Sequence, residues 1–556
     1  MLRNFTDTRR LRRLAKERFG WQTLRPEQIA AMRAIMSGRD TLAILPTGAG
    51  KSAIYQVPAP LLPGPTIVVS PLLALQQDQI ASLTARNHVS LVAVRLSSVE
   101  GKTEQAEALQ ALRAGDAEFV FLTPEQFADP RRVAQIRALK PSLVAVDEAH
   151  CVSAWGHDFR PDYLQLGQFI RELGRPPIVA LTATASPPVR EDIVTRLGMH
   201  DPELVVGELD RPNLFLEAVH CPDEDYRWRR LLGRIRDSSP PGIVYAATRK
   251  ATEELAERLA DEGIDAIAYH GGMSAGARER AHQAFTDDEI QVMVATTAFG
   301  MGIDKPNIRW VNHVGLPDSP DSYLQEIGRA GRDGEPAQVL LLHRTEDTGL
   351  RKFFSSVSVD REEVTNLAIL LRAADMPVSR AALREHTGLS GRRLGQLLTL
   401  LEEVGAAVSR PGGKVCAPVF GTPPEEAGEL AEAQAERRQT VQRSRLDMMR
   451  AFAETLECRG RTLLAYFGEY LAEPCQHCDN CLEGTAATST TGTATAAGKR
   501  GADDPFPVHS QVRHAEWGSG MVLDYAGDQM TVLFDDVGYK TLSVPVVTEN
   551  KLLERS

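Results

Sequence analysis

The chain has 556 residues, of which 43% are hydrophobic and 25% charged, and its formal net charge is −11 at pH 7. This length predicts three to five domains, and no apolar run reaches the roughly 18 residues of a membrane-spanning helix. The acidic balance is only a mild argument against nucleic-acid binding, because such binding needs a local basic track. Seven cysteines, four of them near the end, do not make a disulfide framework. Since no secretory signal follows Met1, a cytoplasmic protein is expected.

Short apolar segments alternate with helical ones through the first two-thirds of the chain. This alternation predicts parallel sheets covered by helices. The pattern breaks near Leu204 to Asn213 and then restarts, so two successive α/β domains are expected, residues 1–207 and 208–350. Examples of the predicted strands are 41–45, 66–70, 119–123, 142–146, 177–182, 242–246 and 291–296.

A glycine-rich turn follows the first predicted strand and opens onto a helical segment. Its backbone N–H groups can point at phosphate oxygens, and a helix N-terminus favours negative charge. Lys51 can reach the β- and γ-phosphates, and the Ser52 hydroxyl can bind Mg²⁺. The turn alone could be an ordinary strand-to-helix loop. Its residues are Thr47, Gly48, Ala49, Gly50, Lys51 and Ser52.

An acidic run, Asp147-Glu148-Ala149-His150, follows the predicted strand 142–146. Asp147 is expected to face the Mg²⁺ ion, and Glu148 to orient or deprotonate the attacking water. Together with the glycine-rich turn, this run predicts hydrolysis of a nucleoside triphosphate.

In the second α/β domain, Arg329 and Arg332 lie among glycines directly after a helical segment, 322–327. Two arginines three residues apart project from one helical face. If that face closes on the nucleotide, one or both can stabilise charge on the transferring phosphoryl group. The alternative, a solvated basic face, is disfavoured because glycines weaken a helix interior.

Over roughly residues 15–345 the chain resembles the RecQ family of superfamily 2 DNA helicases. The resemblance implies two tandem RecA-like motor domains that bind ATP and Mg²⁺ between them. It implies adenine recognition by Gln28 with Arg25 near the nucleotide, and catalytic roles for His150 and Gln325. The stretches that carry the resemblance are 19–28, 69–79, 147–150, 181–185, 294–306 and 325–332.

A loop with aromatic and basic residues, 151–163, comes directly after the acidic run. Trp155 and Phe159 can stack on bases, and Arg160 can pair with a phosphate. The alternative is that both aromatic residues belong to the core. The RecQ resemblance implies that this loop couples DNA binding to hydrolysis, and that translocation runs from 3′ to 5′.

Residues 360–420 predict a winged helix, with helices over 366–374, 379–386 and 390–404 and a β-hairpin over 406–417. Arg392 and Arg393 near the start of the third helix are candidates for duplex contact, although winged helices also serve as packing modules. Members of the family usually carry the winged helix after the zinc site, whereas here it comes before.

Four cysteines, Cys458, Cys475, Cys478 and Cys481, predict a closed structural zinc site. His477 lies within the cluster and could be a ligand, but four thiolates already satisfy the metal. Residues 421–484 are therefore expected to form an exposed helix and a zinc-binding subdomain that resembles the family's own.

Residues 485–507 are rich in Ala, Thr and Gly and predict a flexible linker. Short strands with glycines between them over 508–556 predict a small SH3-like or Tudor-like barrel. This segment resembles the C-terminal domain of UvrD-type helicases, which implies RNA polymerase or DNA as its partner.

Two functions remain open on the sequence. The first is an ATP-dependent helicase that unwinds duplex or branched DNA in repair or recombination. The second is a DNA-stimulated ATPase that remodels protein–DNA complexes with little strand separation. An RNA helicase fits the Trp155 loop and the zinc subdomain less well, and a non-catalytic binding module conflicts with the intact nucleotide residues.

Overall fold

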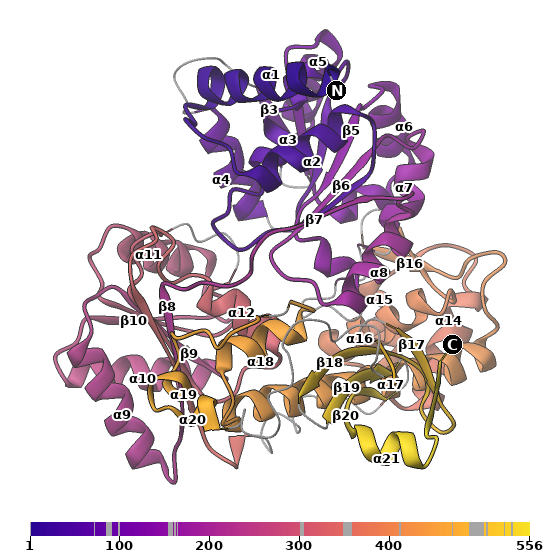
Figure 1. Cartoon of the computed structure of the whole chain (residues 1–556). Coiled ribbons are helices and arrows are strands. Elements are labelled where there is room, and N and C mark those ends of the chain that lie inside the picture. The colour runs from indigo at the N-terminus through magenta and orange to yellow at the C-terminus, as the bar shows by residue number, and fades with distance from the viewer. Residues whose placement is uncertain are drawn as a thin grey trace.

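The computed structural model describes residues 2–71, 73–84, 92–97, 100–153, 160, 163, 165–300, 305–347, 359–410, 413–469, 471–488, 505–507, 510–526, 529–534 and 537–555. Over these residues the chain forms two parallel sheets, a winged helix, a zinc-binding part and a small antiparallel sheet (Figure 1). No helix among them is both long enough and apolar enough to cross a lipid bilayer.

The first sheet has seven parallel strands in the order β3-β4-β2-β5-β6-β1-β7. Its central strands are buried on both faces, which explains their nearly continuous aliphatic composition. The strands are β1 (Thr41–Ile44), β2 (Thr66–Val69), β3 (Ala93–Leu96), β4 (Phe119–Leu122), β5 (Leu143–Val146), β6 (Ile178–Thr182) and β7 (Glu203–Val206). The helices are α1 (Leu2–Phe19), α2 (Pro26–Met36), α3 (Ala53–Gln56), α4 (Leu73–Thr84), α5 (Lys102–Ala114), α6 (Pro130–Ala138), α7 (Leu166–Glu172) and α8 (Pro187–Leu197), with 3₁₀ turns η1 (Ala59–Leu61), η2 (Pro124–Ala128) and η3 (Ala149–Val152).

The second sheet has six parallel strands in the order β10-β11-β9-β12-β13-β8. Its strand β9 starts with Gly242, because a Cβ there would lie 1.9 Å from the ring of Trp310 on β12. The strands are β8 (Leu214–His220), β9 (Gly242–Ala246), β10 (Ala266–Tyr269), β11 (Val292–Ala295), β12 (Trp310–Val314) and β13 (Ala337–His343). The helices are α9 (Glu224–Asp237), α10 (Arg249–Asp261), α11 (Ala275–Thr286) and α12 (Pro320–Ile327). Two tandem parallel α/β domains, the predicted fold class, are thereby confirmed.

The next part has the winged-helix order of elements. Its three-stranded sheet, β14-β16-β15, is antiparallel. The first helix begins five residues earlier than the predicted start at Asn366, because the Asp360 carboxylate caps it by accepting the Glu362 N–H. The elements are α14 (Arg361–Ala373), β14 (Val378–Ser379), α15 (Arg380–Thr387), α16 (Gly391–Glu403), β15 (Val408–Arg410) and β16 (Lys414–Cys416).

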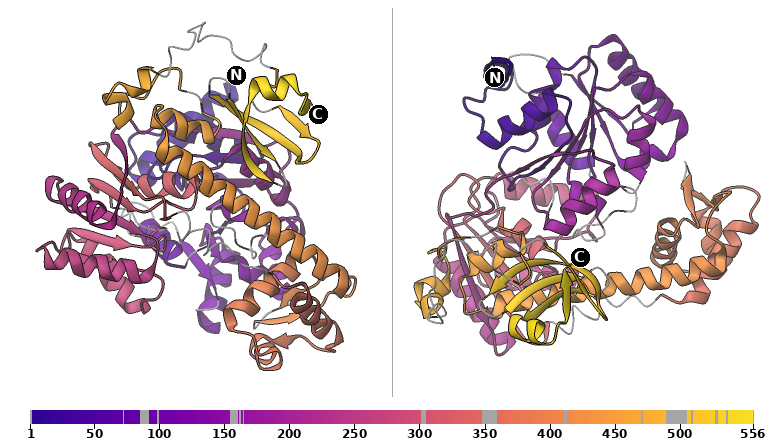
Figure 2. Two further views of the ribbon diagram at one scale, coloured as in Figure 1. Left: turned by 90° about the horizontal axis from the view of Figure 1, so that it is seen from below. Right: turned by 45° about the vertical axis from the view of Figure 1, so that its right-hand side comes forward.

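A single helix, α17 (Pro424–Glu454), links the winged helix to the rest of the molecule (Figure 2). Ala427 and Ala431 in its first turns belong to the winged-helix core. Met449 and Phe452 near its end pack into the core of the second motor domain. One helix thus contributes to both cores, and the predicted boundary at residue 421 falls just before it.

The zinc-binding part contains α18 (Arg459–Tyr466), α19 (Asp479–Leu482) and α20 (Thr485–Thr488). The predicted linker of 485–507 is corrected at both ends: α20 occupies its start, and Phe506 is buried in the core of the C-terminal sheet. Its residues 489–504 lie outside the described part of the chain.

The C-terminal sheet is antiparallel in the order β20-β19-β18-β17-β21, the strand order of an SH3-like barrel. Its elements are β17 (Gln511–His514), β18 (Gly518–Ala526), β19 (Gln529–Phe534), β20 (Gly538–Ser543), α21 (Val544–Glu549) and β21 (Leu553–Arg555). Val522, Val532 and Phe534 fill its own core, whereas Met521 and Leu533 on the opposite face join the core of the second motor domain. The barrel is thus docked on the motor (Figure 2).

Candidate ATP site and zinc centre

The glycine-rich turn leaves the carboxyl end of β1, at the edge of the sheet where α/β proteins bind ligands. Gly48 and Gly50 both have positive φ, +82° and +73°. A Cβ on Gly50 would lie 2.8 Å from the Gln28 amide nitrogen, and one on Gly48 would lie 3.4 Å from the Arg332 side chain. The positive φ at both positions therefore favours glycine, and at Gly50 the Gln28 amide also leaves little room for a Cβ.

Gln28 on α2 holds the turn from its other side. Its Nε2 donates to the carbonyls of Ala49 and Gly50, both at 3.0 Å, and its Oε1 accepts from the Arg25 N–H at 2.9 Å. To recognise an adenine base, the Gln28 amide would have to exchange these hydrogen bonds for bonds to the base. The Arg25 side chain is exposed at the same place.

Lys51 lies with the acidic run at the centre of the site. Its Nζ donates to the Leu45 carbonyl at 3.3 Å. Burial lowers the pKa of Lys51, and Arg332 acts in the same direction, while Glu148 and Asp147 act to raise it. Ser52 follows directly, beside the start of α3.

Asp147 directly follows β5, and its carboxylate is largely removed from water. Oδ2 accepts from the Gln79 Nε2 at 3.0 Å, and Oδ1 from the Glu148 N–H at 3.0 Å. Burial raises the pKa of Asp147, although Lys51 and the Gln79 hydrogen bond oppose the shift. A hard divalent cation such as Mg²⁺ suits oxygen donors such as this carboxylate and the Ser52 hydroxyl.

Glu148 has a left-handed backbone, with φ of +49°. Its Oε2 lies 3.4 Å from the Nδ1 of His150, which is itself 3.0 Å from the Thr182 Oγ1. The Thr182 hydroxyl donates to the Thr184 carbonyl at 2.9 Å. A continuous polar chain thus joins the predicted water-orienting carboxylate to the end of β6.

The two arginines after α12 differ in place. Arg332 lies beside the turn: a Cβ on Gly48 would be 3.4 Å from its side chain, and its charge acts on Lys51. A Cβ on Gly328 would be 3.7 Å from the Thr47 Cβ. Arg329 is 2% exposed and lies against Tyr245 inside the second domain. Gln325, on α12, is partly buried.

Two residues that sequence reasoning missed hold the arginine loop. Arg211 Nη2 donates to the Ala330 and Gly331 carbonyls at 3.0 and 2.8 Å. Asn213 Nδ2 donates to the Gly331 and Glu335 carbonyls, both at 2.9 Å. The sequence marks them only as a basic residue and an amide residue in the connection between the two sheets.

The predicted coupling loop is only partly described. Arg160 Nη1 donates to the Pro71 carbonyl at 3.1 Å, which joins the loop to the segment after β2. Trp155 and Phe159 lie outside the described residues.

The four cysteines meet as predicted, with all Sγ atoms within 4.8 Å of one another. Cys475 and Cys481 have their sulfurs 4.0 Å apart, close to the roughly 3.8 Å edge of a tetrahedron with Zn–S bonds of about 2.3 Å. A Cβ on Gly460 would lie 2.7 Å from the Cys475 Cβ, so the cluster needs glycine there. This arrangement fits a closed structural zinc site.

His477 points away from the cysteines. Its Nδ1 lies 2.9 Å from the Leu214 carbonyl and its Nε2 3.3 Å from Asp210. The hydrogen bond with Asp210 raises the pKa of His477. His477 therefore connects the zinc loop to the second sheet.

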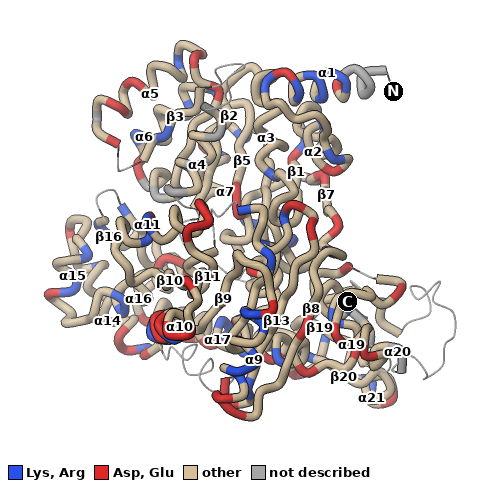
Figure 3. Tube along the Cα trace, turned by 90° about the vertical axis from the view of Figure 1, so that its left-hand side faces the viewer, with Lys and Arg blue, Asp and Glu red and all other residues tan. Residues whose placement is uncertain are grey.

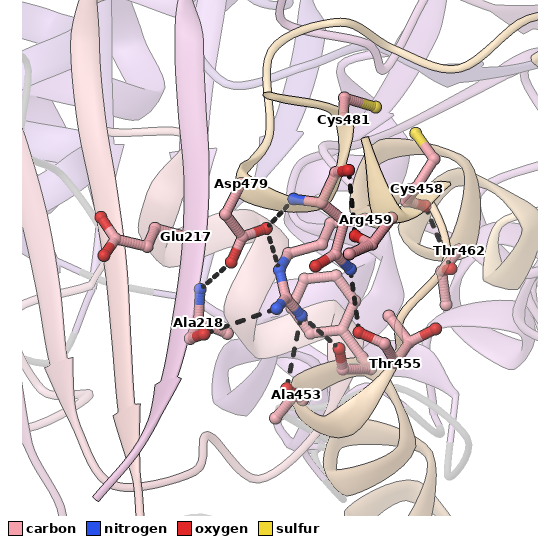
Figure 4. A network of polar contacts seen from close by, with 12 residues as sticks. Glu217, Ala218, Ala453, Thr455, Cys458, Arg459, Thr462, Asp479 and Cys481 are labelled. Atoms are coloured by element: carbon pink, nitrogen blue, oxygen red, sulfur yellow. Dashed lines mark hydrogen bonds and ion pairs between the residues drawn. The ribbon is translucent and has the colours of Figure 1, made fainter. Parts of the chain in front are cut away.

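A second connection runs through Arg459 (Figure 4). Its Nε donates to Asp479 at 2.5 Å and its Nη1 to the Phe452 carbonyl at 3.0 Å. Asp479 in turn accepts from the Ala218 N–H on β8 at 3.0 Å. The zinc loop thus joins α17 to the edge of the second sheet.

In the winged helix, Arg392 is exposed at the start of α16. Arg393 pairs with Glu363 on α14 through Nη2 at 2.5 Å. Of these two candidates for duplex contact, Arg393 thus has an intramolecular partner.

Three protein families match consecutive parts of the chain: DEAD/DEAH box helicase over residues 25–193, helicase conserved C-terminal domain over 227–334 and RecQ zinc-binding over 426–482. A solved structure, the DUF1998 helicase MrfA bound to DNA, covers 75% of this chain and 59% of its own with a TM-score of 0.50 and 17% identity. That likeness supports the fold of the motor.

Curated relatives cover most of the chain. "Probable ATP-dependent DNA helicase RecS" of Bacillus subtilis is 38% identical over 64% of this chain and 72% of its own length. "ATP-dependent DNA helicase RecQ" of Pasteurella multocida is 35% identical over 84% of this chain and 61% of its own, and the protein of that name in B. subtilis 40% identical over 62% of this chain and 58% of its own. The chain thus spans about three fifths of these two RecQ proteins. With the nucleotide residues, paired motor domains and zinc cluster, these matches place the chain in the RecQ family of superfamily 2 helicases.

Proposed function

We propose that this chain is an ATP-dependent DNA helicase that moves from 3′ to 5′ along one strand and unwinds duplex or branched DNA. The observation that carries the proposal is the position of Arg332, whose side chain would lie 3.4 Å from a Cβ on Gly48 and whose charge acts on Lys51. The charge-stabilising residue of one motor domain is thus beside the phosphate-binding turn of the other.

The chain's own groups divide the work of hydrolysis. The turn 47–52 and Lys51 bind the phosphates, and Glu148 orients the attacking water. Arg332 stabilises charge on the transferring phosphoryl group. Bound Mg²⁺, held by Ser52 and Asp147, would neutralise phosphate charge.

Coupling to DNA rests on the elements that surround the acidic run. Arg160 is bonded to Pro71, directly after β2, and the Glu148–His150–Thr182 chain leads to the end of β6. A movement of the loop with Arg160 or of the end of β6 can therefore be transmitted to the catalytic carboxylates. The net charge is no obstacle, since α1 alone exposes Arg9, Arg10, Arg12 and Arg13 (Figure 3).

Strand separation needs an exposed, rigid group, and a turn after the wing offers one. Val419 and Phe420 are 84% and 100% exposed at the tip of a turn closed by the Gly421 N–H and the Pro418 carbonyl. Arg372 bonds the Gly421 carbonyl and holds the turn on α14. We assign Phe420 to stacking on a terminal base of the duplex.

The test is strand displacement on a fork with a 3′ single-stranded tail, with ATP hydrolysis recorded in the same sample. Displacement that depends on Lys51 and is lost in Phe420→Ala, with hydrolysis unchanged, supports the helicase. DNA-stimulated hydrolysis without displacement in the unaltered protein would instead support a translocase that remodels protein–DNA complexes.

The barrel was expected to contact RNA polymerase or DNA. Its face with Met521 and Leu533 is already covered by the motor. We propose that any such partner binds the opposite side, where Trp517 is partly exposed with Lys540 above its ring.

A further inference from the structure

A buried polar cluster joins side chains from four different elements. Asp321 on α12, Arg445 on α17, Tyr466 on α18 and Tyr539 on β20 are each at most 5% exposed. The Tyr466 hydroxyl donates to the Asp321 carboxylate at 2.5 Å. Arg445 lies close enough to Asp321 and both tyrosines for all three to act on its pKa. The cluster therefore balances one buried carboxylate with one buried guanidinium and a hydroxyl donor.

The barrel closes this cluster. The Tyr539 ring stacks on the Tyr466 ring, with centroids 5.1 Å apart and an interplanar angle of 26°. A Cβ on Gly538, the preceding residue, would lie 2.2 Å from the Ser444 hydroxyl on α17, so the strand presses directly on that helix. The barrel thus covers one face of the Tyr466 ring.

The cluster acts on both motor domains. Asp321 is at the start of α12, whose far end runs into Gly328 and the loop with Arg332. An eight-residue helix is only about 12 Å long and moves as one rod. On the other side, Tyr539 is close enough to Ser186 for that hydroxyl to lower its pKa, and Ser186 begins α8 of the first motor domain.

A parallel contact also bridges the domains. Arg190 on α8 donates to the Phe467 carbonyl at the end of α18, at 2.8 Å. Glu469 accepts from the Leu209 N–H, between the two sheets, at 3.2 Å. The zinc-binding part and the barrel therefore hold the first motor domain and α12 together.

We infer that the C-terminal barrel is an intramolecular brace of the motor. In this role Tyr539 and Tyr466 are positioning residues that hold α12, and through it Arg332, on the phosphate-binding turn. The inference rests on the proposed function for the role of Arg332, whereas the docking of the barrel stands independently.

The docking is tested by cleavage. A specific protease site is inserted between residues 490 and 500 of the full chain, and the cut protein is passed over a sizing column. A brace predicts that the barrel elutes with the motor. Separation of the two pieces would overturn the inference, whatever the protein's activity.

The positioning role is tested by kinetics with saturating single-stranded DNA. Tyr539→Ala is expected to lower kcat about tenfold with the KM for ATP within twofold, while Tyr539→Phe, which keeps the stack, retains most of the turnover. Thr541→Ala is the matched control, because Thr541 lies on the same strand and its side chain is exposed. Normal kcat and KM in Tyr539→Ala would overturn the role.

A double variant identifies the route. If Tyr539 acts through Arg332, Tyr539→Ala causes no further loss of kcat in the Arg332→Ala protein. If Tyr539→Ala lowers kcat in that protein as much as in the unaltered one, Tyr539 does not act through Arg332. Should Tyr539→Ala fail to fold, Tyr466→Phe removes only the hydroxyl bonded to Asp321 and is put through the same cycle. If Arg332→Ala alone keeps full turnover, the proposed function of Arg332 fails, and the cleavage result still decides the docking.

Discussion

Arg329 and Arg332 are the same residue type three positions apart, and the structure predicts opposite consequences of removing them. Arg332 is partly exposed over Gly48, so Arg332→Ala should leave stability nearly unchanged. An arginine finger contributes about 10³–10⁵-fold to turnover. Since Lys51 remains, we expect an effect at the lower end of this range. The expected fall in kcat is about 10³-fold, which corresponds to about 4 kcal/mol of activation free energy.

Arg329 is 2% exposed beside Tyr245, so Arg329→Ala removes a buried side chain from the second domain. A loss of about 3 kcal/mol is typical of such a change. For a domain of this size that corresponds to a fall in melting temperature of roughly 6–12 °C. Hydrolysis at low temperature should then survive better than in Arg332→Ala.

The assay measures kcat and KM for ATP with saturating single-stranded DNA, and the melting curve of each variant. Arg236→Ala on α9, where the side chain is 53% exposed, is the control for loss of an arginine. Arg332→Lys should recover little, because an ammonium does not reproduce the planar fork. Turnover lost in Arg329→Ala at an unchanged melting temperature, but retained in Arg332→Ala, would refute the assignment.

Four further predictions concern other parts of the molecule. Lys51→Ala should abolish hydrolysis while DNA binding, followed by fluorescence anisotropy, persists; surviving turnover would contradict the ATP site. Cys478→Ser should release zinc, measured with a colorimetric chelator, and lower the melting temperature, since metal binding there is folding energy. Because burial raises the pKa of Asp147 and the Gln79 hydrogen bond opposes it, Gln79→Ala should shift the acidic limb of the pH–kcat/KM profile to higher pH; an unshifted limb would count against this. Trp155→Ala should lower DNA stimulation of hydrolysis more than the basal rate, and equal losses would dismiss a coupling role.

Much of the site could be predicted because its chemistry is local. A glycine-rich turn after an apolar strand, an acidic run after another and four cysteines with zinc spacing each depend on residues close together in the chain. The alternation of short apolar segments with helical ones likewise predicted both sheets. The burial of a strand depends on a short run of residues, so it can be read locally.

The sequence by itself thus determined the two parallel α/β domains and the four clustered cysteines, and it predicts the nucleotide residues. Only the tertiary structure decided that Arg332, and not Arg329, lies beside the turn and that Arg211 holds its loop. It also decided that Tyr539 stacks on Tyr466, whose hydroxyl donates to Asp321 on α12. Each of these contacts joins residues from different elements, and Tyr539 is more than 200 residues from Asp321. The direction of a side chain at such a contact depends on how two separate elements pack against each other. This packing leaves no periodic pattern in the sequence of either element.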